Sequence, residues 1–208
     1  MPQNIAWENE YKNPQLVTKE DQPQKDVLRF FKFLKKEEDI ELNNLTVLDL
    51  GSGTGRNANY LAELDSKVVG FEISPTAINL AKSRAKKMEV EVDYRLHSIG
   101  SKYPFDNEMF DLALDITSSN SLSEEERNIY LSEVYRVLKK NGYFFVKGLC
   151  KDGDKNAKKL LKNNHGAEPD TYINKYLNLV ERIFTQQDFV NLYSKYFKII
   201  KKNKLYKI

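Results

Sequence analysis

A glycine-rich loop is the part of this sequence whose residue types and spacing best suit chemistry. It reads DLGSGTG over residues 49–55 and stands between a run of strand formers and a helical stretch. Its glycines permit positive φ and let the backbone approach a ligand closely, and the start of the following helix offers unpaired N–H groups. We therefore expect this loop to bind a ligand through its backbone.

Three classes of ligand-binding loop share this glycine-rich appearance. A phosphate-binding loop requires a Gly-Lys pair that is absent after Gly51, and the third glycine of a dinucleotide fingerprint would fall at Arg56. The remaining pattern, G-x-G-x-G with Asp49 two positions before it, indicates a nucleoside that carries an amino-acid tail. Glu72 lies 21 residues after Gly51, where a carboxylate accepts hydrogen bonds from ribose hydroxyls. Taken alone, Glu72 could equally be an exposed charge at a strand end.

Alternating strands and helices surround this loop. Strand-like runs fall at residues 45–50, 67–73, 90–94, 110–115 and 143–146, and a last strand region begins at residue 197. Asp21, Ser74, Ser123 and Thr185 are placed to cap the helices that follow them. This alternation predicts βαβ units and an α/β fold with a mainly parallel sheet.

Composition limits the class of protein. The chain has 208 residues and a net charge of +3, which is too small to indicate a nucleic-acid binder by itself. Cys150 is the only cysteine, so we expect neither a disulfide within the chain nor a cysteine-based zinc site, and we expect no other metal. The sequence shows no apolar run of about 20 residues and no signal pattern at its start, so we expect a cytoplasmic protein with no membrane segment. We divide it into an N-terminal arm or lid, 1–22, and a single domain, 23–208.

Four segments carry a resemblance to a known family. Residues 47–55, 69–74, 103–112 and 134–143 resemble the motifs of the class I S-adenosylmethionine-dependent methyltransferases, and the chain looks closest to the small single-domain members. The resemblance implies a Rossmann-like three-layer α/β/α sandwich with an antiparallel last strand. It also implies S-adenosyl-L-methionine as the cofactor and residues 23–208 as the methyltransferase domain.

The resemblance also assigns roles to single residues. Asp49 and the glycine loop would contact the methionine part of the cofactor, Glu72 its ribose and Ile73 its adenine. His97 stands where the family has an acidic residue facing the adenine amino group, which is a departure from the pattern, and the alternative for His97 is a surface turn. In small members an arm such as the one with Trp7 and Tyr11 closes over the cofactor. The residues expected to bind cofactor are Trp7, Tyr11, Asp49, Gly51, Ser52, Gly53, Gly55, Glu72, Ile73, His97, Ser98 and Asp115.

Two residues are candidates for a catalytic role. Methyl transfer from a sulfonium is an in-line displacement, so the protein mainly aligns the acceptor with the methyl group. Asp115, at the end of the strand 110–115, is expected to contact the cofactor's amino group or the acceptor, and its alternative role is to cap the loop 117–120. His165, in a polar loop at 163–172 that suits an acceptor lid, is the candidate base, and its alternative is an exposed loop histidine.

These assignments leave three functions open. The leading prediction is methyl transfer to a small-molecule acceptor by a monomer or homodimer. The second is methylation of RNA or protein, for which lysines at 158, 159 and 162 and in the tail would supply phosphate contacts. The third is a non-catalytic module that binds S-adenosylmethionine. Lysine-rich surfaces are more often simply solvated, so we do not expect nucleic acid as the partner.

Overall fold

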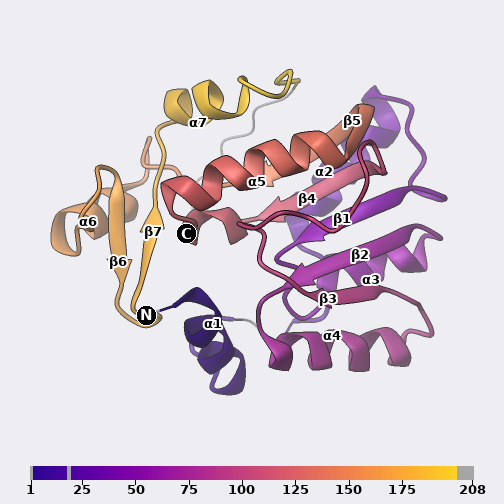
Figure 1. The fold of residues 1–208 in the computed structure, drawn as a ribbon, viewed down its shortest axis with the longest axis horizontal. Coiled ribbons are helices and arrows are strands. Elements are labelled where there is room, and N and C mark those ends of the chain that lie inside the picture. The colour runs from indigo at the N-terminus through magenta and orange to yellow at the C-terminus, as the bar shows by residue number, and fades with distance from the viewer. Residues whose placement is uncertain (1, 18–19, 201–208) are drawn as a thin grey trace.

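The main sheet has five parallel strands. In the computed structural model, which describes residues 2–17 and 20–200, they follow the order β3-β2-β1-β4-β5 (Figure 1). Their bounds are Thr46–Leu50 (β1), Lys67–Glu72 (β2), Asp93–Leu96 (β3), Phe110–Ile116 (β4) and Leu138–Lys147 (β5). The order reverses between β1 and β4, and ligands of such sheets bind at the carboxyl ends of the strands at this point. The predicted α/β class is confirmed.

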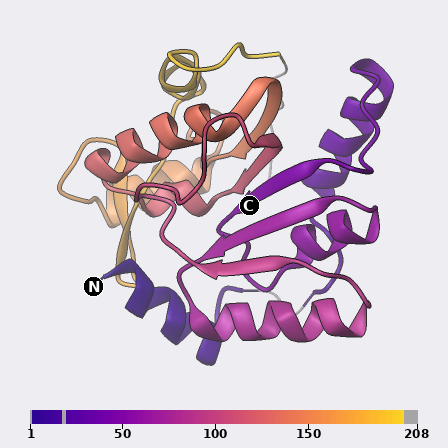
Figure 2. The same cartoon turned by 45° about the vertical axis from the view of Figure 1, so that its right-hand side comes forward.

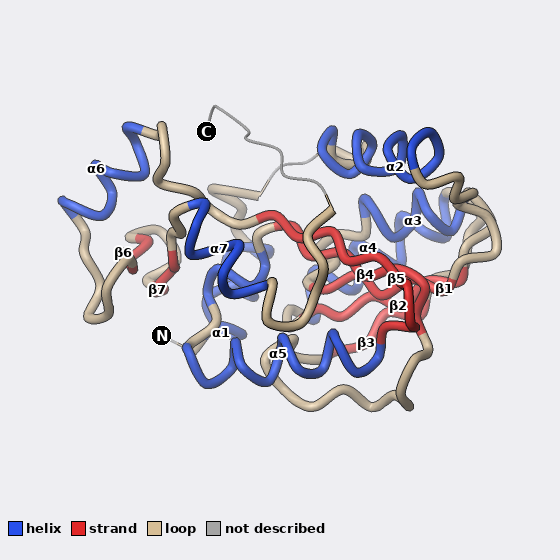
Figure 3. Tube along the Cα trace, turned by 90° about the horizontal axis from the view of Figure 1, so that it is seen from above, coloured by secondary structure: helices blue, strands red, loops and turns tan. Residues whose placement is uncertain are grey.

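Helices cover both faces of this sheet, as Figure 3 shows from above. One core joins the sheet to α2 (Lys25–Glu37), α3 (Arg56–Glu63) and α4 (Pro75–Lys87). A second core, on the other face, joins it to α5 (Glu124–Val137) and to α7 (Gln186–Tyr193). Side chains of β1 point alternately to the two faces of the sheet, so Val47 belongs to the first core and Leu48 to the second. The three-layer prediction is therefore confirmed.

Side-chain caps fix where most of the predicted helices begin. Ser74, Ser123 and Thr185 accept hydrogen bonds from backbone N–H groups of α4, α5 and α7, as expected. The prediction for Asp21 is wrong. Helix α2 begins after Gln24 with no side-chain cap, and Asp21 instead forms an ion pair with Arg84.

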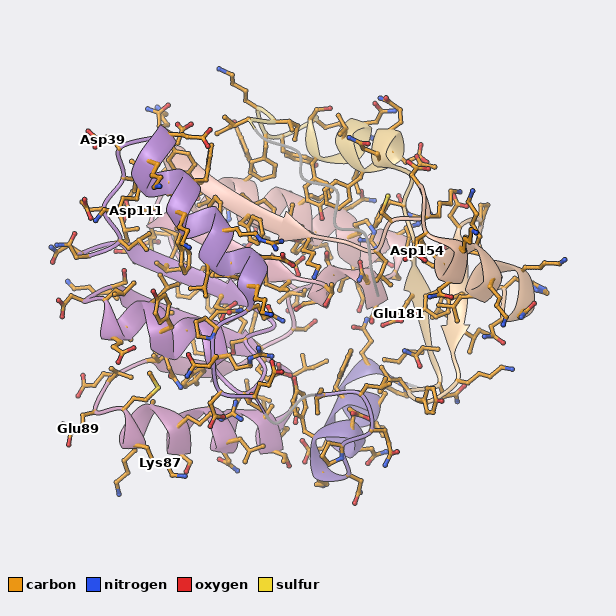
Figure 4. All side chains as sticks on the ribbon, turned by 180° about the vertical axis from the view of Figure 1, so that it is seen from behind. Asp39, Lys87, Glu89, Asp111, Asp154 and Glu181 are labelled. Carbon is orange, nitrogen blue, oxygen red and sulfur yellow. The ribbon has the colours of Figure 1, made fainter. Side chains whose placement is uncertain are left out.

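A smaller unit stands beyond the carboxyl ends of the strands. It consists of α6 (Lys155–Asn163) and an antiparallel hairpin of β6 (Thr171–Asn174) and β7 (Leu179–Arg182). Asp154 caps α6, and Figure 4 labels it together with Glu181 of β7. The sequence did not predict α6 or the hairpin. β7 lies beside η1 (Ser118–Ser121), the short 3₁₀ helix that follows β4.

The N-terminal arm contains helix α1 (Gln3–Lys12), which packs against α4. Figure 2 shows that α1 also lies next to the turn of the β6–β7 hairpin, where Ala6 and Trp7 meet Leu177 and Leu179. Among the described residues, no helix has the length and apolar character needed to cross a membrane.

The antiparallel pairing occurs in the separate hairpin and not at the end of the main sheet. The last strand region, which was expected to begin at residue 197, has no strand over residues 197–200. The rest of it, residues 201–208, lies outside the described part of the chain.

Candidate functional site

The glycine loop joins the end of β1 to the start of α3. Gly51, Gly53 and Gly55 have φ values of 72°, 55° and 81°, a conformation that favours glycine. The backbone N–H of Ser52 donates to the carbonyl of Phe71 over 2.8 Å, which ties the loop to β2. A Cβ atom on Gly51 would lie 2.1 Å from the Oγ atom of Ser118. The loop therefore needs a glycine at position 51 for its conformation and for space.

Asp49 places a carboxylate beneath this loop. The residue is 2% exposed, and its Oδ2 atom has no hydrogen-bond partner among the described residues. Burial raises the pKa of Asp49 to about 7, and the nearby charges of Asp115 and Glu72 add to the rise. A buried carboxylate oxygen without a partner is costly, so this atom is suited to receive a donor or cation from a ligand.

Glu72, at the end of β2, holds the loop from the other side. Its Oε2 atom accepts the N–H of Gly53 over 2.9 Å, and Oε1 accepts the N–H groups of Ile73 and Ser74 over 2.7 and 2.9 Å. Burial raises its pKa in spite of these bonds. Each carboxylate oxygen has two acceptor sites, so Oε2 keeps one for a hydroxyl group.

Asp115 lies next to this loop in the sheet, because it pairs in register with Leu50. It is fully buried, and protein groups occupy both of its oxygens. Tyr130 donates its hydroxyl to Oδ2 over 2.6 Å, while Oδ1 accepts the N–H groups of Ser118 (2.8 Å) and Ser119 (3.4 Å). This geometry makes Asp115 the cap of the turn after β4.

That turn contains a strained residue. Thr117 has a φ of 69°, which is a genuine outlier for a β-branched side chain. Its N–H donates to the carbonyl of Lys147 over 2.8 Å, and the following residue, Ser118, lies against Gly51. Strain of this kind is concentrated at functional sites. Sequence reasoning did not mark Thr117 and Ser118 as site residues, because nothing in the sequence indicates that this threonine adopts a positive φ.

The residues expected around the adenine lie beyond β2 and β3. Ile73 is half-buried beside Glu72. The ring of His97 lies 4.4 Å from that of Phe71, its Nε2 atom is 3.1 Å from the carbonyl of Lys102, and burial lowers its pKa. Ser98 accepts the N–H of Gly100 through its Oγ atom over 3.2 Å. The Nε2 atom of His97 and the Oγ atom of Ser98 thus have partners within their own loop, and the adenine contact stays a prediction.

Helix α1 brings Tyr11 to the glycine loop. The hydroxyl of Tyr11 is 2.8 Å from the position that a Cβ atom would take on Gly53, so the helix rests directly on the glycine loop. Burial and the charge of Glu72 raise the pKa of Tyr11. The ring of Trp7 is 6.3 Å from that of Tyr11.

His165 is not gathered with these residues. It is exposed and forms an isolated bridge with Tyr172, between α6 and β6. Figure 1 shows that these elements stand apart from the main sheet. Its role as a base stays a prediction.

The segment that holds the glycine loop matches a known family. A family described as "Methyltransferase domain" matches residues 47–142, which run from β1 through α5 into β5. This segment is similar to methyltransferase domains, and it makes up just under half of the chain. The predicted resemblance to the S-adenosylmethionine-dependent methyltransferases is confirmed, and S-adenosylmethionine is the cofactor of that class.

Two curated proteins illustrate the relationship. A ubiquinone biosynthesis O-methyltransferase of Pelagibacter ubique is 30% identical over 125 residues, which are 60% of this chain and 50% of that protein. Sterol 4-C-methyltransferase strm-1 of Caenorhabditis elegans is 30% identical over 135 residues, which are 63% of this chain and 40% of that protein. The chain thus spans half or less of the length of these relatives.

A solved structure extends the likeness to most of the fold. An S-adenosylmethionine-dependent methyltransferase from Methanosarcina mazei superposes with a TM-score of 0.67 at 21% identity, over 83% of this chain and 84% of that one. Identity at that level supports the fold. The buried Asp49 oxygen and the left-handed glycines also fit the family's cofactor, since they offer an acceptor for an ammonium group and open backbone beside it.

Proposed function

We propose that this protein transfers a methyl group from S-adenosylmethionine to a small-molecule acceptor. The observation that carries the proposal is the unpartnered Oδ2 atom of Asp49, buried beside a loop of left-handed glycines. A neutral or phosphate-bearing ligand would leave that carboxylate unpaired, whereas the ammonium of an amino-acid tail pairs with it. Glu72 would accept hydrogen bonds from the ribose hydroxyls, and it lies 21 residues after Gly51, a spacing typical of folds that bind nucleosides.

The residues of the site would act by binding and alignment. Bound S-adenosylmethionine supplies a methyl group on a positively charged sulfur, which is a good leaving group. Asp49 would hold the amino-acid tail, Glu72 the ribose hydroxyls, and Tyr11 with Trp7 would exclude water from above. Asp115 would act indirectly. Its hydrogen bond with the N–H of Ser118 fixes the turn after β4, and that turn lies beside Gly51. Holding two reactants in line supplies much of the rate enhancement in such displacements.

The acceptor is proposed from the relatives, whose names refer to ubiquinone, demethylmenaquinone and a sterol. RNA or protein is the alternative acceptor. Four of the tail lysines that would favour RNA, at 201, 202, 204 and 207, lie outside the described residues. Product formation that falls steeply with added salt would favour RNA, and a rate that does not change through neutral pH would argue against His165 as a base.

The assembly and location are also proposals. We propose a monomer or homodimer in the cytoplasm. The single cysteine supports a location where no disulfide is required.

Calorimetry tests the central proposal. We expect heat of binding with S-adenosylmethionine and with S-adenosylhomocysteine, and none with NAD or ATP. Asp49→Asn should weaken binding by about tenfold or more, because it removes a charged hydrogen bond. Asp93→Asn is the matched control, since Asp93 is exposed and paired with Arg95 at the start of β3. Binding of NAD in place of both nucleosides would overturn the proposal.

A further inference from the structure

A carboxylate outside the predicted site connects helix α1 with the start of α4. The Oε2 atom of Glu8 accepts the hydroxyl of Ser74 over 2.6 Å and the N–H of Thr76 over 3.1 Å. Its Oε1 atom accepts the hydroxyl of Thr76 over 2.7 Å and lies 3.1 Å from the Nζ atom of Lys12. The first turn of a helix carries unpaired N–H groups and a partial positive charge, so a carboxylate is stabilised there.

The charge of Glu8 is strongly stabilised in this position. Burial would raise its pKa, but the hydrogen bonds from Ser74 and Thr76 and the contact with Lys12 outweigh burial and lower the pKa to about 2. At neutral pH the contact is therefore between an ionised carboxylate and the helix start. This contact attaches α1 to the half of the molecule that holds the glycine loop.

Ser74 carries this contact onward to the ribose carboxylate. Its hydroxyl donates to Glu8, while its backbone N–H donates to the Oε1 atom of Glu72 over 2.9 Å. The same Oγ atom caps α4 by accepting the N–H of Ala77 over 3.1 Å. Glu8 and Glu72 are thus joined through one residue, Ser74.

The rest of α1 spans the site. Tyr11 rests on Gly53, Trp7 packs with the hairpin turn, and the Nε2 atom of Gln3 donates to Glu126 of α5 over 3.0 Å. Beyond the helix, the Oε1 atom of Glu10 accepts three successive N–H groups, those of residues 15–17, over 2.6–2.9 Å. The helix is therefore held at both ends, and it contacts α4, α5, the hairpin turn and the glycine loop.

We propose that Glu8 is a positioning residue of the cofactor site. It keeps α1 closed over the glycine loop and, through Ser74, keeps Glu72 in the orientation that receives a ribose, so that cofactor exchange requires the contacts of Glu8 to break. This inference rests on the proposed function. It assigns a role to a residue that no sequence motif marks.

The rate of S-adenosylhomocysteine release tests the inference. Trp7 is the only tryptophan and lies on α1, so its fluorescence in a stopped-flow instrument reports the movement. Glu8→Ala should raise the dissociation rate by about tenfold or more, and Glu8→Gln, which keeps one acceptor, by less. Asn9→Ala is the matched control, because Asn9 is the exposed neighbour on the same helix, and its rate should equal that of the unaltered protein.

Two further measurements separate the possible failures. Thr76→Val removes one hydroxyl donor and leaves the helix intact, so it should raise the dissociation rate about threefold even if Glu8→Ala does not fold. If Glu8→Ala and Thr76→Val lower the melting temperature but leave the association and dissociation rate constants of S-adenosylhomocysteine unchanged, Glu8 is only a structural anchor and the inference is wrong. If the unaltered protein gives no heat with S-adenosylhomocysteine, the proposed function itself has failed.

Discussion

Binding of the cofactor should release a proton from Asp49. In the free site burial and the charges of Asp115 and Glu72 hold the pKa of Asp49 at about 7. An ammonium group placed against its unpartnered Oδ2 atom favours the charged carboxylate and lowers that pKa by several units. The site therefore binds its ligand in the deprotonated form, and the proton carried by the free site is lost to the buffer.

The size of the effect follows from the pKa. The free carboxyl group is protonated to about 0.9 at pH 6, 0.5 at pH 7 and 0.1 at pH 8, and these fractions are the protons released. Affinity should rise about tenfold between pH 6 and pH 8. Isothermal calorimetry in phosphate and in imidazole measures the release directly, because both buffers work between pH 6 and 8 and have very different enthalpies of ionisation.

Variants identify the source of the proton. In Asp49→Asn the dependence of the binding heat on the buffer should disappear, while in Asp93→Asn it should remain. Tight binding with the same heat in both buffers at pH 6 would refute the reasoning. Release that persists in Asp49→Asn would assign the proton to Glu72 or Asp115 and would refute it as well.

Four other perturbations have defined outcomes. Gly51→Ala would place a Cβ atom 2.1 Å from the Oγ atom of Ser118 at a φ of 72°, so it should abolish cofactor binding in calorimetry and destabilise the fold by at least about 1 kcal/mol in urea. Tyr130→Phe leaves the buried Oδ2 atom of Asp115 without its donor and should cost about 1–3 kcal/mol in the same assay. Thr117→Gly relieves the left-handed strain and should stabilise the protein by about 1 kcal/mol, and a loss of stability would mean that the side chain is needed for packing. The pKa of Asp49 is higher in the folded chain (about 7) than in the unfolded one (3.8), so the native state binds more protons between these two pH values. The free energy of unfolding of the unliganded protein should therefore fall as pH rises from about 4 to 7, by at most about 4 kcal/mol. In Asp49→Asn the melting temperature should change less over the same pH range.

Local signals predicted the half of the site that lies on β1 and β2. The glycine loop follows its strand directly, and Glu72 ends the next strand, so sequence spacing determines where both residues lie once a parallel sheet forms. Ser74 was predicted as a helix cap for the same reason, because a cap and its helix are adjacent in the chain.

Contacts between distant segments were not predictable in this way. Glu8 lies 66 residues before Ser74, and nothing in the arm indicates that its carboxylate reaches another helix. The hairpin of β6 and β7 was missed because each strand has only four residues, and the polar segment 163–172 was interpreted as a loop. Asp115 was predicted as a site residue from its place at a strand end. The hydrogen bond that Tyr130 donates to it could not be predicted, because it depends on how α5 packs against the sheet.

The grouping of Asp49, Glu72 and Asp115 in one buried region also affects how the two forms of the cofactor compete. The reactant carries a sulfonium charge that the thioether product lacks, so the negative field of these carboxylates favours the reactant and weakens inhibition by the product. The same field opposes the reaction to a small extent, since the positive charge on sulfur is dispersed as the methyl group leaves. A site of this kind therefore has a slightly lower maximal rate but is inhibited less as the product accumulates.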